Sequence, residues 1–462
     1  MIKKIVKKVQ VVKKVVKKAT AKPKVAPKKK NTPKAIYDVV IIGGGPAGLM
    51  AACTAGASGA KVLLLEKNEE LGKKLLISGG GRCNLTNANP NQREFVSKFG
   101  KRGSFLFTPL SIFGVERTIK FFNNLGLKTK IEPGFRVFPE SDDSFDVLNT
   151  LVNQAKKLAV EFRLSAEVSG LKTDKKTKKI ISIVLISGEE ISANKFILTT
   201  GGMSHPETGS TGDGFKWLKE IGHKVAASNP SLVPIKIKED WISELSGITL
   251  DNVGVSVWTL TDGFAKKEIN KKGRVLFTHV GLTGPTILNM SKNIGDLLEY
   301  SKNGGDKAGM EVSVALDFFS GVGLDQMHEM MKKVFDEHIN KKIKNLSFKE
   351  VPAKIFDLII RQLEIDPEWE INEIKREERI ALIEKFKKFE MTVSGLLGFD
   401  KAIISSGGLD LNEVDFKTMG SKLYDNLYFA GDILDFDRPS GGFSLQLCWT
   451  TGYVAGKSVI NN

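Results

Sequence analysis

The sequence predicts an α/β protein in which a parallel sheet is interrupted by a β-rich segment and a helical segment. Three observations support this fold class. A strand, a glycine turn, a helix and a second strand follow one another over residues 38–65. Short β-rich runs occupy 231–319, and the charged stretch 324–389 has a helical hydrophobic period. The strand-helix-strand order of the first segment is typical of a parallel sheet.

Length and composition indicate a globular protein of two or three domains. The chain has 462 residues, more than one hydrophobic core usually serves, and 41% of them are hydrophobic. Cys53, Cys83 and Cys448 are far apart and form no C-x-x-C pair. This spacing argues against a disulfide framework, a zinc site or a dithiol centre, so we expect no metal and a reducing, cytoplasmic location.

The positive charge is concentrated at the N-terminus. The formal net charge is +16, but residues 1–34 contain 14 lysines and no acidic residue, which leaves +2 for the rest. We expect a disordered, solvated tail there, and a basic segment that contacts anionic surfaces or nucleic acid is the alternative. No uncharged apolar run reaches the roughly 18 residues needed to cross a bilayer, and lysine pairs interrupt any signal-peptide pattern.

The expected elements follow this plan along the chain. The first βαβ unit has a strand at 38–42, a helix at 47–58 and a strand at 61–65. Further helices are expected at 115–125 and 144–158, short strands at 162–186, a buried strand at 195–199, strands of a small barrel or sandwich at 253–260 and 312–316, a strand at 427–430 and a final helix at 442–460. Met327, Met330, Met331 and Val334 share one helical stripe, which we interpret as core packing.

The glycine turn carries the first chemical motif. Gly43, Gly45 and Gly48 form G-x-G-x-x-G after a strand and at the start of a helix, and Glu66 follows at the end of the next strand. The glycines allow a tight turn, approach of a pyrophosphate to the backbone, and close helix packing, while Glu66 suits a ribose hydroxyl. The motif predicts a dinucleotide site, and both NAD and FAD remain open at this point.

Three other segments favour FAD. Residues 75–87 form a second glycine-rich loop with exposed amides, Arg82 and Asn84, which a simple dehydrogenase does not need. Residues 196–202 form a strand that ends in glycines, and 208–214 follow with three more glycines, which close approach of the backbone to a ligand would explain. Asp432 follows the strand 427–430 and suits a ribityl hydroxyl. A plain loop or surface turn is the alternative for the last two segments.

The predicted FAD contacts come from all of these segments and from the start of the last helix, whose dipole would face the flavin pyrimidine. They are Gly43, Gly45, Pro46, Ala47, Gly48, Glu66, Lys67, Lys74, Ser78, Gly79, Gly80, Arg82, Cys83, Asn84, Val168, Thr200, Gly201, Gly202, Asp432, Gly441, Gly442 and Phe443.

With these residues in view, the sequence resembles the BaiN/YhiN-like family of bacterial flavoproteins, described as NAD(P)/FAD-dependent or aminoacetone-oxidase-like oxidoreductases. The resemblance runs from Tyr37 to the C-terminus. Its motifs are GKKLLISGGGRCNLTN (72–87), GGMSHPETGSTGDG (201–214), GRVLFTHVGLTGP (273–285) and LYFAGDILDFDRPSGGFSLQ (427–446).

The resemblance implies a two-dinucleotide-type Rossmann FAD domain with an inserted β-barrel domain that itself carries a small helical insert. The expected boundaries are 1–34 for the tail, 35–229 with 402–462 for the FAD domain, 230–322 with 390–401 for the barrel that binds substrate, and 323–389 for the helical insert. Two features depart from the family. The basic tail has no counterpart there, and Asp437-Arg438 replaces a small or acidic pair, which makes Arg438 a candidate for altered substrate preference.

The expected reaction is hydride transfer at flavin N5 to or from a small or medium organic molecule. The resemblance leaves C=C reduction and amine or C–H dehydrogenation open. No second G-x-G-x-x-G follows a strand after Gly48, so NAD(P)H, if used, would dock transiently. His279 is the candidate catalytic residue and His205 the second, although a locally bonded histidine is the favoured reading of His279. The alternatives are a nucleic-acid-associated flavoprotein recruited by the tail and a non-catalytic FAD module.

Overall fold

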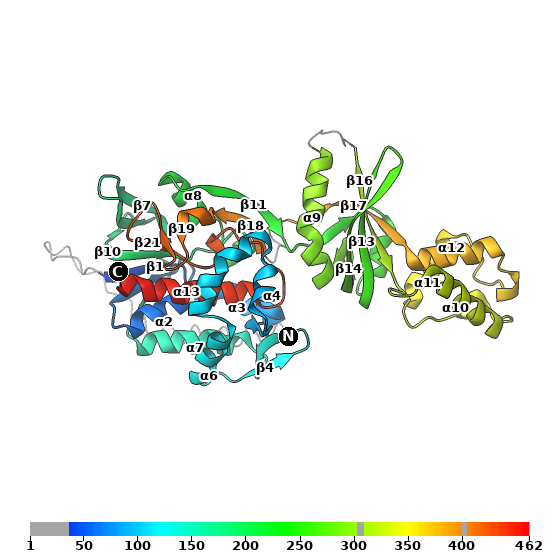
Figure 1. Cartoon of the computed structure of the whole chain (residues 1–462), viewed down its shortest axis with the longest axis horizontal. Helices are drawn as coiled ribbons and strands as arrows, with labels where there is room; N and C mark the ends of the chain where they lie inside the picture. Colours follow the sequence, from blue (N-terminus) through cyan, green and yellow to red (C-terminus); the bar gives the residue numbers. More distant parts are fainter. Residues whose placement is uncertain (1–36, 303–308, 399–403, 462) are drawn as a thin grey trace.

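The computed structural model describes residues 37–302, 309–398 and 404–461, which form two lobes along one long axis (Figure 1). Each lobe has its own hydrophobic core. The first core takes residues from 37–218 and 409–459, and the second takes residues from 235–393. The lysine-rich tail lies outside the described residues, so both readings of it stay predictions.

The first lobe is built on a seven-stranded sheet in the order β19-β20-β21-β10-β1-β2-β6. The strands from β21 to β6 are parallel, and the expected βαβ unit is confirmed. Val39, Val40 and Ile41 are fully buried in the first core. The bounds are β1 (Tyr37–Ile42), β2 (Val62–Leu65), β6 (Glu161–Arg163), β10 (Ala193–Leu198), β19 (Val414–Asp415), β20 (Gly420–Ser421) and β21 (Leu427–Phe429).

Two glycine-rich helices lie against each other beside this sheet (Figure 1). They are α2 (Pro46–Ala57), which follows β1, and α13 (Phe443–Asn461), which ends the chain. A Cβ atom at Gly452 would lie 2.5 Å from the carbonyl oxygen of Ala47, and one at Gly456 would lie 2.5 Å from that of Ala51. The helices therefore pack backbone to backbone, and the two ends of the chain build one lobe.

The remaining elements of the first lobe surround this core. The helices are α3 (Lys73–Ile77), α4 (Gln92–Ser97), α5 (Phe107–Ile112), α6 (Val115–Asn124), α7 (Ser144–Lys157) and α8 (Asp213–Glu220). Two small antiparallel sheets contain β3 (Thr86–Asn87), β4 (Thr129–Glu132) and β5 (Arg136–Pro139), and β7 (Val168–Asp174), β8 (Lys179–Leu185) and β9 (Glu190–Ile191). The helices expected at 115–125 and 144–158 are confirmed as α6 and α7.

The second lobe contains six antiparallel strands that close on themselves, because β12 pairs with both β15 and β17. Val255, Val257 and Val314 are fully buried inside the ring. The strands are β12 (Ile235–Ile237), β13 (Thr249–Thr261), β14 (Phe264–Thr278), β15 (Gly281–Thr283), β16 (Glu311–Asp317) and β17 (Phe389–Leu396). Between β15 and β16 lies α9 (Pro285–Lys302), a helix that the sequence pattern did not predict.

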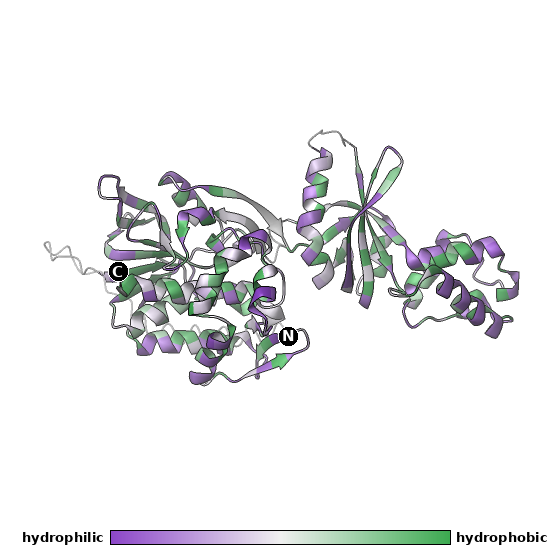
Figure 2. Ribbon diagram, viewed as in Figure 1, coloured by the Kyte–Doolittle hydropathy of each residue, from purple (hydrophilic) through white to green (hydrophobic). Residues whose placement is uncertain are grey.

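Three helices extend the second lobe between β16 and β17, in the segment where a helical insert was expected. They are α10 (Leu324–Glu337), α11 (Ala353–Gln362) and α12 (Arg376–Lys387). Their outer turns are largely hydrophilic in Figure 2, and the predicted packing of the methionine stripe is confirmed. Met327 and Met331 are buried in the second core, and Met330 and Val334 pack against it.

The lobes are joined by β11 (Val225–Ser231), which pairs with β18 (Ile404–Leu409), and by contacts of α9. Lys292 Nζ on α9 lies 2.6 Å from Asp437 Oδ2, and Asn289 Oδ1 accepts a hydrogen bond from the Ser440 amide at 3.0 Å. Within the described ranges, no helix is long and apolar enough to span a membrane.

Candidate functional site

A cleft lies at the carboxyl ends of the parallel strands, where open α/β sheets bind their ligands. The ends of β1, β2 and β10 contribute Gly43, Glu66 and Thr200, and the turn after β21 contributes Asp432. The cleft encloses about 860 Å³, including its mouth open to solvent. Of the predicted contacts, its lining contains Gly43, Gly45, Pro46, Ala47, Glu66, Lys67, Lys74, Val168, Thr200, Gly201 and Asp432.

The glycines of the turn have different surroundings. A Cβ atom at Gly48 would lie 1.9 Å from the Gly43 carbonyl oxygen, so this glycine allows α2 to pack against β1. A Cβ atom at Gly45 would meet no atom within 4 Å and would enter the cleft. Gly45 is also the N-cap of α2, and no side chain caps that helix. The turn thus leaves backbone and a helix N-terminus open to an anionic ligand, which fits the pyrophosphate of FAD.

Glu66 is held in place at the end of β2. Its Oε2 accepts the Gly44 amide at 2.8 Å, and its Oε1 accepts the Asn68 amide at 2.9 Å and Asn68 Nδ2 at 2.7 Å. The residue is 9% exposed. A carboxylate has about four acceptor positions, so Glu66 retains capacity for a ligand hydroxyl.

The loop 208–214 closes this end of the cleft. Asn68 Nδ2 donates to the Thr208 carbonyl oxygen at 3.0 Å, and Lys67 Nζ lies 2.7 Å from Asp213 Oδ2. Asn68, Ser210 and Asp213 also line the cleft and were not predicted. The glycine pattern of 208–214 was the available signal, but it did not reveal that the loop folds onto β2.

Opposite charges meet at the other end of the cleft. Arg438 Nη1 donates to Asp432 Oδ1 at 2.7 Å, and Arg438 is 3% exposed. Lys74 Nζ donates to Ser204 Oγ at 3.2 Å. Burial lowers the pKa of Lys74, and the nearby Asp432 opposes this effect. Arg438 and Asp432 form a buried ion pair at this end of the cleft, and Lys74 lies near both of them.

The second glycine-rich loop lies next to the cleft, and its predicted contacts are not in the lining. Arg82 forms ion pairs with Glu132 and Asp142 and lies over the Phe138 ring at 4.0 Å. Asn87 Nδ2 donates to the Gly441 carbonyl oxygen at 3.2 Å, so this loop meets the turn before α13. The contacts assigned to Gly48, Ser78, Gly79, Gly80, Arg82, Cys83, Asn84, Gly202, Gly441, Gly442 and Phe443 stay predictions.

The cysteines are free, buried thiols. Burial raises the pKa of Cys53 and of Cys83 to about 12 and that of Cys448 further, so all three are protonated at neutral pH. Cys448 lines the cleft and was not predicted. In the part of the chain that the structure describes, no group of three His, Cys, Asp or Glu side chains could hold a metal ion.

Neither candidate histidine lines the cleft. His279 is exposed in the turn between β14 and β15 of the second lobe. His205 precedes a short turn, and its Nδ1 lies 2.8 Å from Glu207 Oε1. Their catalytic roles stay predictions.

Comparisons with known proteins agree with this geometry. The chain is 30% identical over 424 residues to a 3-dehydro-bile acid delta(4,6)-reductase of Clostridium scindens, covering 90% of this chain and 98% of that protein. It is 27% identical to a ribosomal RNA dihydrouridine synthase of Escherichia coli, covering 92% of this chain and 98% of that protein.

The fold has a counterpart among solved structures. A 3-ketosteroid delta1-dehydrogenase of Sterolibacterium denitrificans superposes with a TM-score of 0.52 at 12% identity, covering 92% of this chain and 99% of that one. The model of the HI0933-like protein Rossmann domain matches residues 37–458. The chain therefore belongs to the HI0933-like family, the BaiN/YhiN-like group that its motifs resemble, and it is an FAD-dependent oxidoreductase.

Proposed function

We propose that the protein reduces a carbon–carbon double bond conjugated to a carbonyl group, with NAD(P)H as the electron donor. The observation that carries this proposal is the reaction shared by its two full-length relatives. A 3-oxo steroid with a delta-4 bond is an enone, and dihydrouridine is uridine whose double bond beside a carbonyl has been reduced. The steroid and the nucleobase differ in shape, but the bond that reacts is of one kind.

The residues of the cleft would hold FAD in one orientation. Gly45 and the N-terminus of α2 would contact the pyrophosphate, Glu66 the adenosine ribose, and Asp432 a ribityl hydroxyl. Arg438 would position Asp432 through their 2.7 Å hydrogen bond. When bound, FAD supplies two-electron hydride chemistry at N5.

The proposed reaction balances without another oxidant or reductant. NAD(P)H provides a hydride equivalent that ends on the β-carbon of the substrate, and a proton from solvent or a side chain ends on the α-carbon. The product is the saturated carbonyl compound, with NAD(P)⁺ as the second product. The buried thiols of Cys83 and Cys448 are poor proton donors, because their raised pKa values keep the proton bound.

The test is an anaerobic half-reaction. FAD-loaded protein is reduced with NADPH or NADH, freed of excess nucleotide, and mixed with testosterone, with uridine, or with the saturated steroid dihydrotestosterone as control. We expect an enone to restore the visible flavin band and to gain two hydrogens, while the saturated steroid does neither. Bleaching of the oxidised flavin by an amine or a saturated ketone, with no reoxidation of the reduced flavin by enones, would instead indicate a dehydrogenase acting in the opposite direction.

A uridine in RNA is the second candidate substrate, because relatives from Escherichia coli and Haemophilus influenzae carry the name ribosomal RNA dihydrouridine synthase. This candidate requires an RNA-binding surface in addition to the cleft. Reduction of uridine in an RNA hairpin, with no reduction of the free nucleoside, would favour it over the steroid-like substrate.

A further inference from the structure

We infer that the β13–β14 ribbon binds RNA, with lysines of the groove on its outer face that contact phosphates and Phe264 at its tip that stacks on an unpaired base. The inference rests on the proposed function only in its choice of uridine-bearing RNA as the partner. It concerns a surface of the second lobe that none of the cleft residues shares.

The ribbon has a shallow groove on its outer side. Along β13, Val253, Val255 and Val257 point into the core, so Gly254, Ser256 and Trp258 alternate to the outside. The small side chains of Gly254 and Ser256 leave a depression between β14 and the end of α12. The groove is lined by five lysines and one aspartate, namely Lys267, Lys271, Lys272, Lys387, Lys388 and Asp317.

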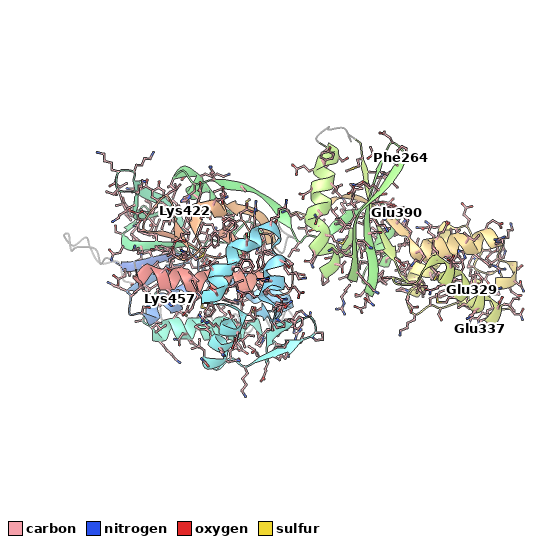
Figure 3. The ribbon with its side chains drawn as sticks, in the orientation of Figure 1. Phe264, Glu329, Glu337, Glu390, Lys422 and Lys457 are labelled. Atoms are coloured by element: carbon pink, nitrogen blue, oxygen red, sulfur yellow. The ribbon has the colours of Figure 1, made fainter. Side chains whose placement is uncertain are left out.

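Two of these lysines are available to a ligand. Lys387 pairs with Asp317 at 2.8 Å, and Lys388 pairs with Glu390, labelled in Figure 3, at 2.9 Å. Lys267 and Lys272 lie opposite Trp258 and Gly254, are exposed, and among the described residues form no salt bridge with a carboxylate; Lys272 Nζ donates to the Ser320 carbonyl oxygen at 3.2 Å. A concentration of positive charge on this face is not explained by composition, because residues 35–462 carry a net charge of only +2.

Two lysine side chains of the groove lie over the ring of Trp258. The ammonium of Lys267 lies 4.9 Å from the centroid of its ring, and that of Lys388 lies 4.6 Å from it. The Trp258 Nε1 donates to Ser256 Oγ at 2.9 Å, which fixes the ring. Cation–π contacts therefore hold two lysine side chains over the groove and reduce the entropy lost when they bind phosphates.

The tip of the ribbon supplies an exposed aromatic ring. Phe264 is 81% exposed and projects from the end of the β13–β14 hairpin (Figure 3). Asp262 and Gly263 have positive φ values of 50° and 81°, the tight hairpin geometry that presents this tip. Phe264 lies three residues from Lys267, roughly 10 Å along the strand and on the opposite face of the ribbon, so RNA bound in the groove would reach its ring around the tip. Aromatic rings beside lysines bind unpaired RNA bases by stacking while the cations hold the backbone.

The contributions of the lysines and of Phe264 to RNA binding can each be measured on the full-length protein, without reductant. The ligands are an RNA hairpin with a uridine loop and a duplex of the same stem, each titrated at several salt concentrations. We expect Lys267→Gln with Lys272→Gln to weaken hairpin binding about tenfold and to reduce the slope of log K against log salt by about 1.4. Phe264→Ala should weaken hairpin binding with no change in that slope, and should not affect duplex binding.

The matched control is Lys332→Gln with Lys333→Gln on α10, which removes the same charge from exposed residues outside the groove. Equal effects of the two double variants would assign RNA binding to general charge, including that of residues 1–34, and would overturn the inference. Retention on phosphatidylglycerol vesicles that depends on Phe264, with no retention of RNA, would assign the tip to a membrane surface. RNA binding without enone reduction would refute the proposed function and leave the RNA surface standing.

Discussion

Gly45 and Gly48 belong to one turn, but only at Gly48 would an added Cβ atom lie close to other protein atoms. A substitution at Gly48 should therefore affect folding, and one at Gly45 should affect ligand binding. The methyl group of Gly48→Ala would lie 1.9 Å from the Gly43 carbonyl oxygen, so we expect a lower melting temperature with or without FAD. The methyl group of Gly45→Ala would meet no protein atom within 4 Å, so the apoprotein should melt as the wild type does.

The Gly45→Ala methyl group would occupy space in the cleft, so we expect FAD affinity to fall at least about tenfold, close to 1.4 kcal/mol. Flavin fluorescence titration of both glycine variants, with melting curves of the apoproteins, measures these outcomes. Unchanged FAD affinity in Gly45→Ala would place the cofactor elsewhere.

Glu66 is the residue expected to contact the adenosine ribose of FAD. Glu66→Ala removes the acceptor of the Gly44 amide and of both Asn68 donors, so we expect a loss of about 1–3 kcal/mol of stability and weaker FAD binding. Glu66→Gln keeps one acceptor oxygen and should lose less of both. Denaturant unfolding and FAD titration of the two variants give the comparison, and equal FAD affinity in wild type and Glu66→Ala would exclude a ribose contact.

At the scale of elements, buried His223 connects the end of α8 to the turn before β19. Its Nδ1 lies 2.7 Å from Glu413 Oε2, and its Nε2 lies 3.0 Å from Ser421 Oγ. Burial lowers the pKa of His223 and outweighs the effect of Glu413, which raises it. The unfolded chain therefore binds the proton more readily than the folded chain, and stability present above about pH 6.5 is lost as pH falls toward the lower folded pKa.

We expect the urea midpoint of the wild type to decrease between pH 7 and pH 5. The titration of this residue should lower the free energy of unfolding by at most about 1.4 kcal/mol for each pH unit. His223→Gln keeps hydrogen-bonding capacity without the titration, so its midpoint should depend less on pH. Identical pH dependence of the two proteins would show that His223 is not the group responsible.

Elements with a strong sequence pattern were predictable, and the others depended on tertiary packing. The expected strand 38–42 and helix 47–58 occur at Tyr37–Ile42 and Pro46–Ala57, because apolar runs and glycines encode them locally. The helix α9 lies inside the segment 231–319 that was expected to be β-rich, and it contains Gly295, a residue of low helix propensity. A Cβ atom there would lie 2.8 Å from Leu396 Cδ1, so packing against β17 explains the glycine.

The residues of the candidate site were predictable where they lie close together in the sequence, and not where only the fold brings them together. Gly43, Gly45 and Glu66 were predictable from spacing within one βαβ unit. Lys74 and Ser204, whose side chains hydrogen-bond across 130 residues of sequence, could be placed together only by the folded chain.

At the scale of the whole molecule, the two separate cores predict two unfolding events. The cleft belongs to the first lobe, so saturating FAD should stabilise that lobe alone, by about 2.7 kcal/mol at a free concentration of 100 times Kd. Differential scanning calorimetry with and without FAD should show two transitions, one of which moves. A single transition that moves as a unit would show that the contacts of α9 with 437–440 couple the lobes completely.

Whether the cleft holds a flavin that NAD(P)H reduces can be seen in the visible spectrum of purified, desalted protein during anaerobic titration with NADPH and then NADH. We expect a visible flavin band that one of the two nucleotides bleaches and that an enone then restores. A flavin band that neither nucleotide bleaches would contradict the NAD(P)H-driven reductase, and the lack of any flavin band after incubation with FAD would contradict the assignment of the cleft itself.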